Sequence, residues 1–246
     1  MDPFTVVSIA VLLCLAAALY SSVGHGGASA YLAIMALYAV PVATMRPTAL
    51  ALNLLVAGIG AVRYVRADQF NLRLFLAFAV TAIPLAFIGG RIELAPEIYR
   101  PLLGAVLWLS ALRLLWRPAQ LVERPVRTPP LWVTLPAGAA IGLLAGLTGT
   151  GGGIFLSPLI LLIGWETPRR TSGVVAVFIL VNSAAGLAGN LSSLGALPSE
   201  LPIFLGAACL GGLLGTWLGV ARLPRVALLR LLGIVLLVAG AKLLVT

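Results

Sequence analysis

The chain has 246 residues, of which 61% are hydrophobic and only 9% charged, and its mean hydropathy is +1.11. Soluble domains carry about 25% charged residues and disordered chains are still less apolar, so the composition excludes both classes. Sixteen basic residues against seven acidic ones give a net charge of +9. The basic residues stand singly or in small groups between apolar runs, without interleaved aromatic residues, so we expect no nucleic-acid partner. The composition predicts a protein embedded in a lipid bilayer.

Ten continuous apolar runs follow one another along the chain, which predicts an all-α polytopic membrane protein. The predicted segments are 4–23, 27–40, 45–65, 71–90, 98–116, 131–148, 152–164, 171–190, 201–221 and 225–245. The second and the seventh are shorter than the roughly 20 residues that a spanning helix needs, so they either span incompletely or re-enter.

The N-terminus and the two cysteines indicate no processing and no cofactor. Met1-Asp2-Pro3-Phe4 lacks the positive region of a signal peptide, so we expect the first apolar run to be retained. Cys14 and Cys209 lie inside apolar runs and show no metal-binding or disulfide spacing, so packing is their expected role.

The chain resembles a duplication of five segments, with a first repeat at 1–116, a polar linker at 117–130 and a second repeat at 131–246. Four features recur in the same order at offsets that drift from 125 to 129. They are Gly24-His25-Gly26-Gly27 with Gly149-Thr150-Gly151-Gly152, Asn53 with Asn182, Gly104 with Gly233, and Arg113 with Lys242.

Counting basic residues predicts how the repeats cross the membrane. If the first two segments of each repeat both cross, or together form one re-entrant hairpin, one side collects twelve basic residues and the other four. The four are Arg46, Arg91, Arg100 and Lys242. If only the short segments re-enter, the split is eight to eight. The positive-inside rule favours the first arrangement, with both termini outside and the repeats inverted, as in many secondary transporters.

The two glycine motifs, Gly24-His25-Gly26-Gly27 and Gly149-Thr150-Gly151-Gly152-Gly153, each precede a short segment. A short helix that begins directly after each motif would direct free N–H groups and the positive end of its dipole into the glycine turn. Two such ends meeting from opposite sides would form an anion site near the middle of the membrane. The alternative is close helix packing through small residues.

Several polar residues accompany these motifs. His25 could donate to an anion, couple transport to protons through its pKa of about 6.5, or be a structural residue. Arg46 and Arg170 precede the third segment of each repeat; Arg170, beside Arg169, is explained as a topological anchor, whereas Arg46 would bind oxyanions or gate their access.

Asn53 and Asn182 lie inside apolar helices, where an amide either bonds to a neighbouring helix or contacts substrate. The seven acidic residues all fall at segment ends or in loops, which is unlike a cation transporter with a carboxylate inside the membrane. A single histidine with no acid placed beside it also indicates that the protein is not an enzyme.

The motif from Gly146 to Gly153, followed by Leu156-Ser157-Pro158-Leu159, resembles the TauE/SafE family of sulfite and organosulfonate transporters. Thr171-Ser172-Gly173 and Val181-Asn182-Ser183 continue the resemblance, and the first repeat carries a weaker copy in which Ala28 replaces the third glycine. The resemblance implies export, or import, of small sulfur-containing anions across a bacterial inner membrane.

Together these features predict a secondary transporter that holds a small anion at the paired glycine motifs and works by alternating access. Export of neutral or cationic metabolites, and a membrane enzyme or assembly factor acting on lipid-linked substrates, are the alternatives. The substrate anion and the lipid bilayer are the expected partners, and the sequence carries no sign of an oligomeric state.

Overall fold

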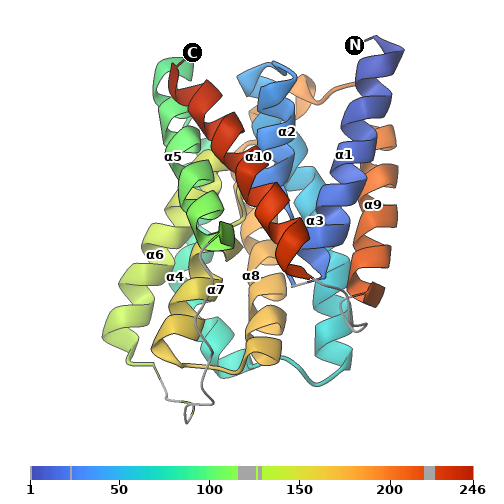
Figure 1. The fold of residues 1–246 in the computed structure, drawn as a ribbon. Coiled ribbons are helices and arrows are strands. Elements are labelled where there is room, and N and C mark those ends of the chain that lie inside the picture. The colour runs from blue at the N-terminus through green and yellow to red at the C-terminus, as the bar shows by residue number, and fades with distance from the viewer. Residues whose placement is uncertain (1, 23, 116–125, 127–128, 219–224, 246) are drawn as a thin grey trace.

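In the computed structural model (Figure 1) the described residues are 2–22, 24–115, 126, 129–218 and 225–245. They form α-helices joined by short connections and contain no strand. The helices are α1 (Pro3–Ser21), α2 (Ala28–Leu37), α3 (Val42–Arg66), α4 (Leu72–Arg91), α5 (Pro96–Leu115), α6 (Leu131–Thr148), α7 (Gly153–Ile163), α8 (Pro168–Gly189), α9 (Leu201–Leu218) and α10 (Arg225–Val245), with a 3₁₀ helix at Leu191–Ala196.

The all-α membrane class predicted from the sequence is confirmed. By length and hydropathy α1, α3, α4, α6 and α8 are able to cross a membrane. An α-helix lies at each of the ten predicted segments, with somewhat different ends, but ten membrane crossings remain a prediction. The predicted linker 117–130 falls almost entirely outside the described residues.

The two short helices begin directly after the glycine motifs, as predicted. Helix α2 starts after Gly27 and has 10 residues, and α7 starts after Gly152 and has 11. At about 1.5 Å per residue neither spans the roughly 30 Å core of a bilayer. Every residue from Ala28 to Ala36 is buried, so α2 is enclosed by protein on all sides, whereas Ile163 at the end of α7 is exposed.

Figure 1 shows both termini at the same end of the bundle. Helix α1 starts at that end and α6 starts at the opposite end. Helices α2 and α7 both start near mid-height; α2 runs back toward the end with the termini and α7 runs to the other end. Helices with the same place in the order of the two sequence halves therefore run in opposite directions.

The closest helix contacts join one sequence half to the other. Helix α1 packs along α9 and α4 along α6. A methyl group added at Gly142 or Gly146 of α6 would overlap the backbone oxygen of Ala82 or Ala86 in α4. On the other side Gly211 of α9 lies equally close to the backbone oxygen of Cys14 in α1. Small residues let helix backbones approach in this way and leave no room for sliding.

Helices α3 and α8 cross at the centre of the molecule between two apolar clusters. One cluster combines side chains of α1, α2, α3, α5, α9 and α10, and the other combines mainly those of α4, α6, α7 and α8. In the middle of the α3–α8 contact a β-carbon at Gly60 would lie 3.6 Å from that of Ala176, whereas near the end of α3 Gly173 packs closely against the backbone oxygen of Gln69. The core thus consists of two packed units, each with helices from both sequence halves.

Candidate functional site at the paired glycine motifs

The turn before each short helix contains glycines with left-handed backbone conformation. Gly24 and Gly27 have φ of +77° and +102°, and Gly149, Gly151 and Gly152 have φ of +82°, +74° and +81°. Other residues rarely adopt such angles, so these positions require glycine. Each turn leads the chain into the N-terminus of a buried helix, where the first N–H groups lack partners within the helix. Within the described part of the chain, the N–H groups of Ala28, Ser29 and Gly153 find no acceptor.

The two motifs meet at Asn53 of α3. A methyl group at Gly26 would overlap Asn53 Oδ1, and one at Gly151 would lie 2.7 Å from Asn53 Nδ2 and 2.9 Å from Ser183 Oγ. Asn53 is fully buried, and its Nδ2 donates to Ser183 Oγ over 3.3 Å. Its Oδ1 has no donor among the described residues. The structure therefore brings together Gly26, Gly151 and Asn53, which the sequence had nominated separately.

Sequence reasoning missed two residues at this meeting point, Ile179 and Ser183 of α8. Ile179 Cγ2 would lie 3.1 Å from a methyl group at Gly26 and 3.0 Å from one at Gly151. Ile179 therefore occupies the place on α8 that Asn53 occupies on α3. Ser183 directly follows Asn182 in the sequence. This pair of polar residues was therefore the available signal, but Ser183 and not Asn182 makes the contact.

Asn182 is buried in α8, but it is not among the nearest neighbours of a methyl group placed at any glycine of the two motifs. Its Nδ2 donates to the backbone oxygen of Phe178 in the same helix over 2.9 Å, and its Oδ1 has no partner among the described residues. Arg170 is partly exposed in the first turn of α8. Pairing Asn53 with Asn182 by sequence offset therefore did not identify residues with equivalent surroundings.

Each motif starts against the N-terminal part of the long helix from the other half. A methyl group at Gly24 would lie 2.6 Å from Ser172 Cβ in α8, and one at Gly149 would lie 3.1 Å from Arg46 Cγ in α3. By this contact Arg46 corresponds to Ser172 rather than to Arg170.

Arg46 is 6% exposed and binds the C-terminal end of α4. Its Nη1 donates to the oxygen of Ile92 over 2.9 Å, and its Nη2 donates to the oxygens of Gly89, over 2.8 Å, and of Gly90. A cation at a helix C-terminus satisfies carbonyls that have no helical partner and is favoured by the dipole. Its Nε finds no acceptor in the described structure.

The polar residues inside the motifs are buried and engaged. His25 donates its backbone N–H to the oxygen of Tyr20 over 2.9 Å, and its ring stands edge-on to that of Tyr20 at 6.4 Å. Thr150, at the corresponding place in the second motif, shares a 2.9 Å hydrogen bond with the hydroxyl of Thr148.

No acidic side chain lies among the nearest neighbours of the motif glycines in the described residues. In the described residues no group of three or more His, Cys, Asp or Glu side chains is placed to hold a metal ion. Glu166 is 6% exposed in the turn between α7 and α8, where Asn71 Nδ2 donates to it over 2.6 Å and the Thr167 N–H over 2.9 Å. The sequence placed this residue correctly in a loop but carried no signal that the loop is buried.

Comparison with known proteins identifies the family of the chain. Residues 9–243 match the family model described as sulfite exporter TauE/SafE. The chain is 39% identical to a probable membrane transporter protein, y4hK, of Sinorhizobium fredii (strain NBRC 101917 / NGR234), over 97% of this chain and 98% of the relative. No solved structure matches the chain. The chain therefore belongs to the TauE/SafE sulfite exporter family and is a multi-pass membrane transporter, not an enzyme.

Proposed function

We propose that this protein carries small sulfur-containing anions, such as sulfite or organosulfonates, outward across the bacterial inner membrane by alternating access. The observation that carries the proposal is the meeting of two helix N-termini, those of α2 and α7, through Gly26 and Gly151 at Asn53. Unpaired N–H groups and the positive ends of two helix dipoles favour an anion without any charged side chain.

The groups around this point include donors that an oxyanion could accept from, beside one unpartnered acceptor, Asn53 Oδ1. Asn53 and Ser183 each offer a donor, and backbone N–H groups supply the rest. Sulfite and sulfonates present several oxygens that take such donors together. A metal cation or an amine would need carboxylates or a cluster of free carbonyl oxygens, and the nearest acidic residues along the chain lie at helix ends and loops.

The distribution of charge supports an orientation with both termini outside. The end of the bundle where α3 ends and α8 begins carries Arg63, Arg66, Arg73, Arg169 and Arg170 among the described residues. At the other end Arg46 binds carbonyls of α4, and Lys242 Nζ donates to the oxygens of Ala36 and Leu37 at the end of α2. Because these two cations serve helix ends, they add little to the positive surface of that side.

The moving parts that we infer are the two packed units and not the sequence repeats 1–116 and 131–246, although the opposite helix directions support inverted repeats. Glycine contacts lock α1 to α9 and α4 to α6, so each pair moves as one body. The units meet where α3 crosses α8, beside the proposed site. Arg46 joins α3 to α4 across this boundary, so opening at its end of the bundle requires Arg46 to release the carbonyls of α4.

Uptake of radiolabelled sulfite into proteoliposomes tests this function. We expect saturable uptake that unlabelled sulfonates inhibit and an amine does not. A pH gradient applied in one series reports whether protons are coupled. The variant Gly26→Leu with Gly151→Leu should insert normally and lose uptake, whereas Gly206→Ala, at an open helix position, should retain it.

Uptake of the amine in place of sulfite would favour the alternative of a neutral or cationic metabolite exporter. Full sulfite uptake by the double variant would place the anion elsewhere in the molecule.

A further inference from the structure

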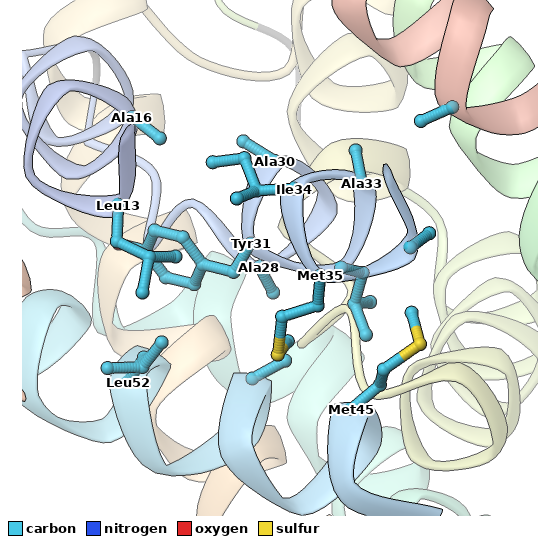
Figure 2. Close-up of a cluster of buried hydrophobic side chains, with 14 of the residues drawn as sticks. Leu13, Ala16, Ala28, Ala30, Tyr31, Ala33, Ile34, Met35, Met45 and Leu52 are labelled. Atoms are coloured by element: carbon cyan, nitrogen blue, oxygen red, sulfur yellow. The ribbon is translucent and has the colours of Figure 1, made fainter. Parts of the chain in front are cut away.

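Tyr31 of α2 binds the backbone of the first glycine motif. Its hydroxyl donates to the carbonyl oxygen of Gly26 over 2.6 Å, and the side chain is wholly buried. Its ring lies against Gly27, since a methyl group there would fall 2.7 Å from Tyr31 Cζ. Figure 2 shows the ring extending from α2 toward Leu13 of α1.

This hydrogen bond determines the direction of one peptide group. In a trans peptide the C=O and the following N–H point in opposite directions, so holding the Gly26 carbonyl toward Tyr31 turns the Gly27 N–H away from it. The glycines on both sides of this peptide would otherwise allow it to rotate easily. The Gly27 carbonyl is already directed into the helix, because it accepts the N–H groups of Ala30 and Tyr31 over 3.0 Å each.

The turned peptide matters for the charge that the motif presents. With the carbonyl held toward Tyr31, the Gly27 N–H points to the opposite side of the peptide, and the free N–H groups of Ala28 and Ser29 follow it in the chain. A rotated peptide would present a carbonyl oxygen there, which repels an anion. We propose that Tyr31 is a positioning residue that keeps the first glycine motif in its anion-binding form. This inference rests on the function proposed above.

The second motif is bound by a tyrosine at its start, because the hydroxyl of Tyr99 in α5 donates to the carbonyl oxygen of Thr148, directly before Gly149, over 3.0 Å. Leu156 stands three residues into α7, as Tyr31 stands three residues into α2, and it has no hydroxyl. Left-handed backbone at both Gly151 and Gly152 shapes that turn instead. Among the described residues, a tyrosine hydroxyl therefore holds the peptide that leads directly into the short helix in the first motif only, and substrate affinity should depend on it there.

The test compares Tyr31→Phe with Tyr20→Phe, because each removes one buried hydroxyl and keeps the ring. The Tyr20 hydroxyl is hydrogen-bonded to Ser29 Oγ at 2.8 Å, whereas that of Tyr31 binds the motif backbone. We expect Tyr31→Phe to raise the KM for sulfite about two- to twelvefold, which corresponds to the about 0.5–1.5 kcal/mol that one hydrogen bond contributes. The maximal rate should stay within about twofold, and Tyr20→Phe should leave the KM within the same limit.

A second measurement does not depend on transport. Hydrogen–deuterium exchange of the peptide that covers residues 24–31 should be faster in Tyr31→Phe than in Tyr20→Phe, because the Gly26–Gly27 peptide is released. Equal KM values, or equal exchange, in the two variants would overturn the role of Tyr31 while leaving sulfite transport intact. Absence of sulfite and sulfonate uptake by the unmodified protein would instead overturn the proposed function, and with it the assignment of Tyr31 to anion binding.

Discussion

The two glycine motifs have similar sequences but different surroundings. The first is lined by the hydroxyl group of Tyr31 and by the β-carbon and backbone of Ser172, and leads into a helix enclosed by protein. The second lies against Ile141 and Phe178 at Gly152, and leads into a helix whose far end is exposed. A duplicated motif therefore preserves the turn and the helix start, while each half is stabilised by different neighbours.

The side chains that pack against the first glycine of each motif also differ. Arg46 packs against Gly149 and is tied to α4, whereas the corresponding contact at Gly24 is made by the small Ser172. A charged group that joins the two packed units is thus present beside the second motif, and only a small hydroxyl residue stands beside the first. The halves should respond unequally to equivalent substitutions.

Alanine substitutions at Gly151 and at Gly26 should show the largest difference in transport between the two motifs. Gly151→Ala places a side chain at a φ of +74° against Asn53, Ser183 and Ile179, so we expect transport to fall more than tenfold. Gly26 lies outside the left-handed region and meets mainly the movable side chain of Asn53, so Gly26→Ala should lose less. The measurement is sulfite uptake at matched protein levels. A greater loss in Gly26→Ala would reverse the assigned asymmetry.

Cross-linking tests which parts of the molecule move. Gly60→Cys with Ala176→Cys has a suitable β-carbon separation of 3.6 Å and joins α3 to α8 across the unit boundary. Val56→Cys with Gly212→Cys joins α3 to α9 inside one unit, because a β-carbon at Gly212 would lie 3.3 Å from Val56 Cγ1.

In a background without Cys14 and Cys209, oxidation should block transport in the first pair and spare it in the second, and a reductant should restore the first. Transport that continues through an α3–α8 disulfide would show that these helices need not move against each other.

Arg46, which packs beside the second glycine motif, should contribute to stability as well as to gating. Arg46→Ala leaves the carbonyls of Gly89, Gly90 and Ile92 without their donor, which we expect to lower the free energy of unfolding by about 1–3 kcal/mol. Ser172→Ala, beside the first motif, should change it by less than about 0.5 kcal/mol. Thermal unfolding of the purified protein in detergent compares the two. Equal midpoints would mean that the guanidinium bonds are balanced by the loss of hydration of Arg46.

The fold class and the starts of α2 and α7 were predictable because they depend on local chemistry. Continuous apolar runs have no stable alternative to helices in lipid, and adjacent glycines interrupt a helix wherever they stand. Asn53 was recognised for a similar reason, since an amide in an apolar run stands out in any context.

The surroundings of the motifs were not predictable from spacing. Asn53 and Asn182 match by offset, yet Ile179 takes the place opposite Asn53, because a shift of three residues moves a side chain by about 4.5 Å along nearly the same face of a helix. Tyr31 looked like one aromatic residue among many apolar ones, since its hydroxyl partner is a backbone carbonyl. Glu166 and Arg46 were recognised as charged residues near segment ends, but their partners come from other helices.

The sequence by itself determined that the chain is a helical membrane protein with two glycine turns before two short helices, because hydropathy and backbone freedom are properties of consecutive residues. Only the tertiary structure decided that the two turns meet at Asn53, that helices of the two halves interlock into two packed units, and that Tyr31 and Arg46 hold backbone carbonyls. These features depend on which helix faces stand opposite each other. Packing between distant segments decides which faces meet; Asn53 and Ser183, for example, are more than a hundred residues apart in the chain. Such packing leaves no pattern in the local sequence.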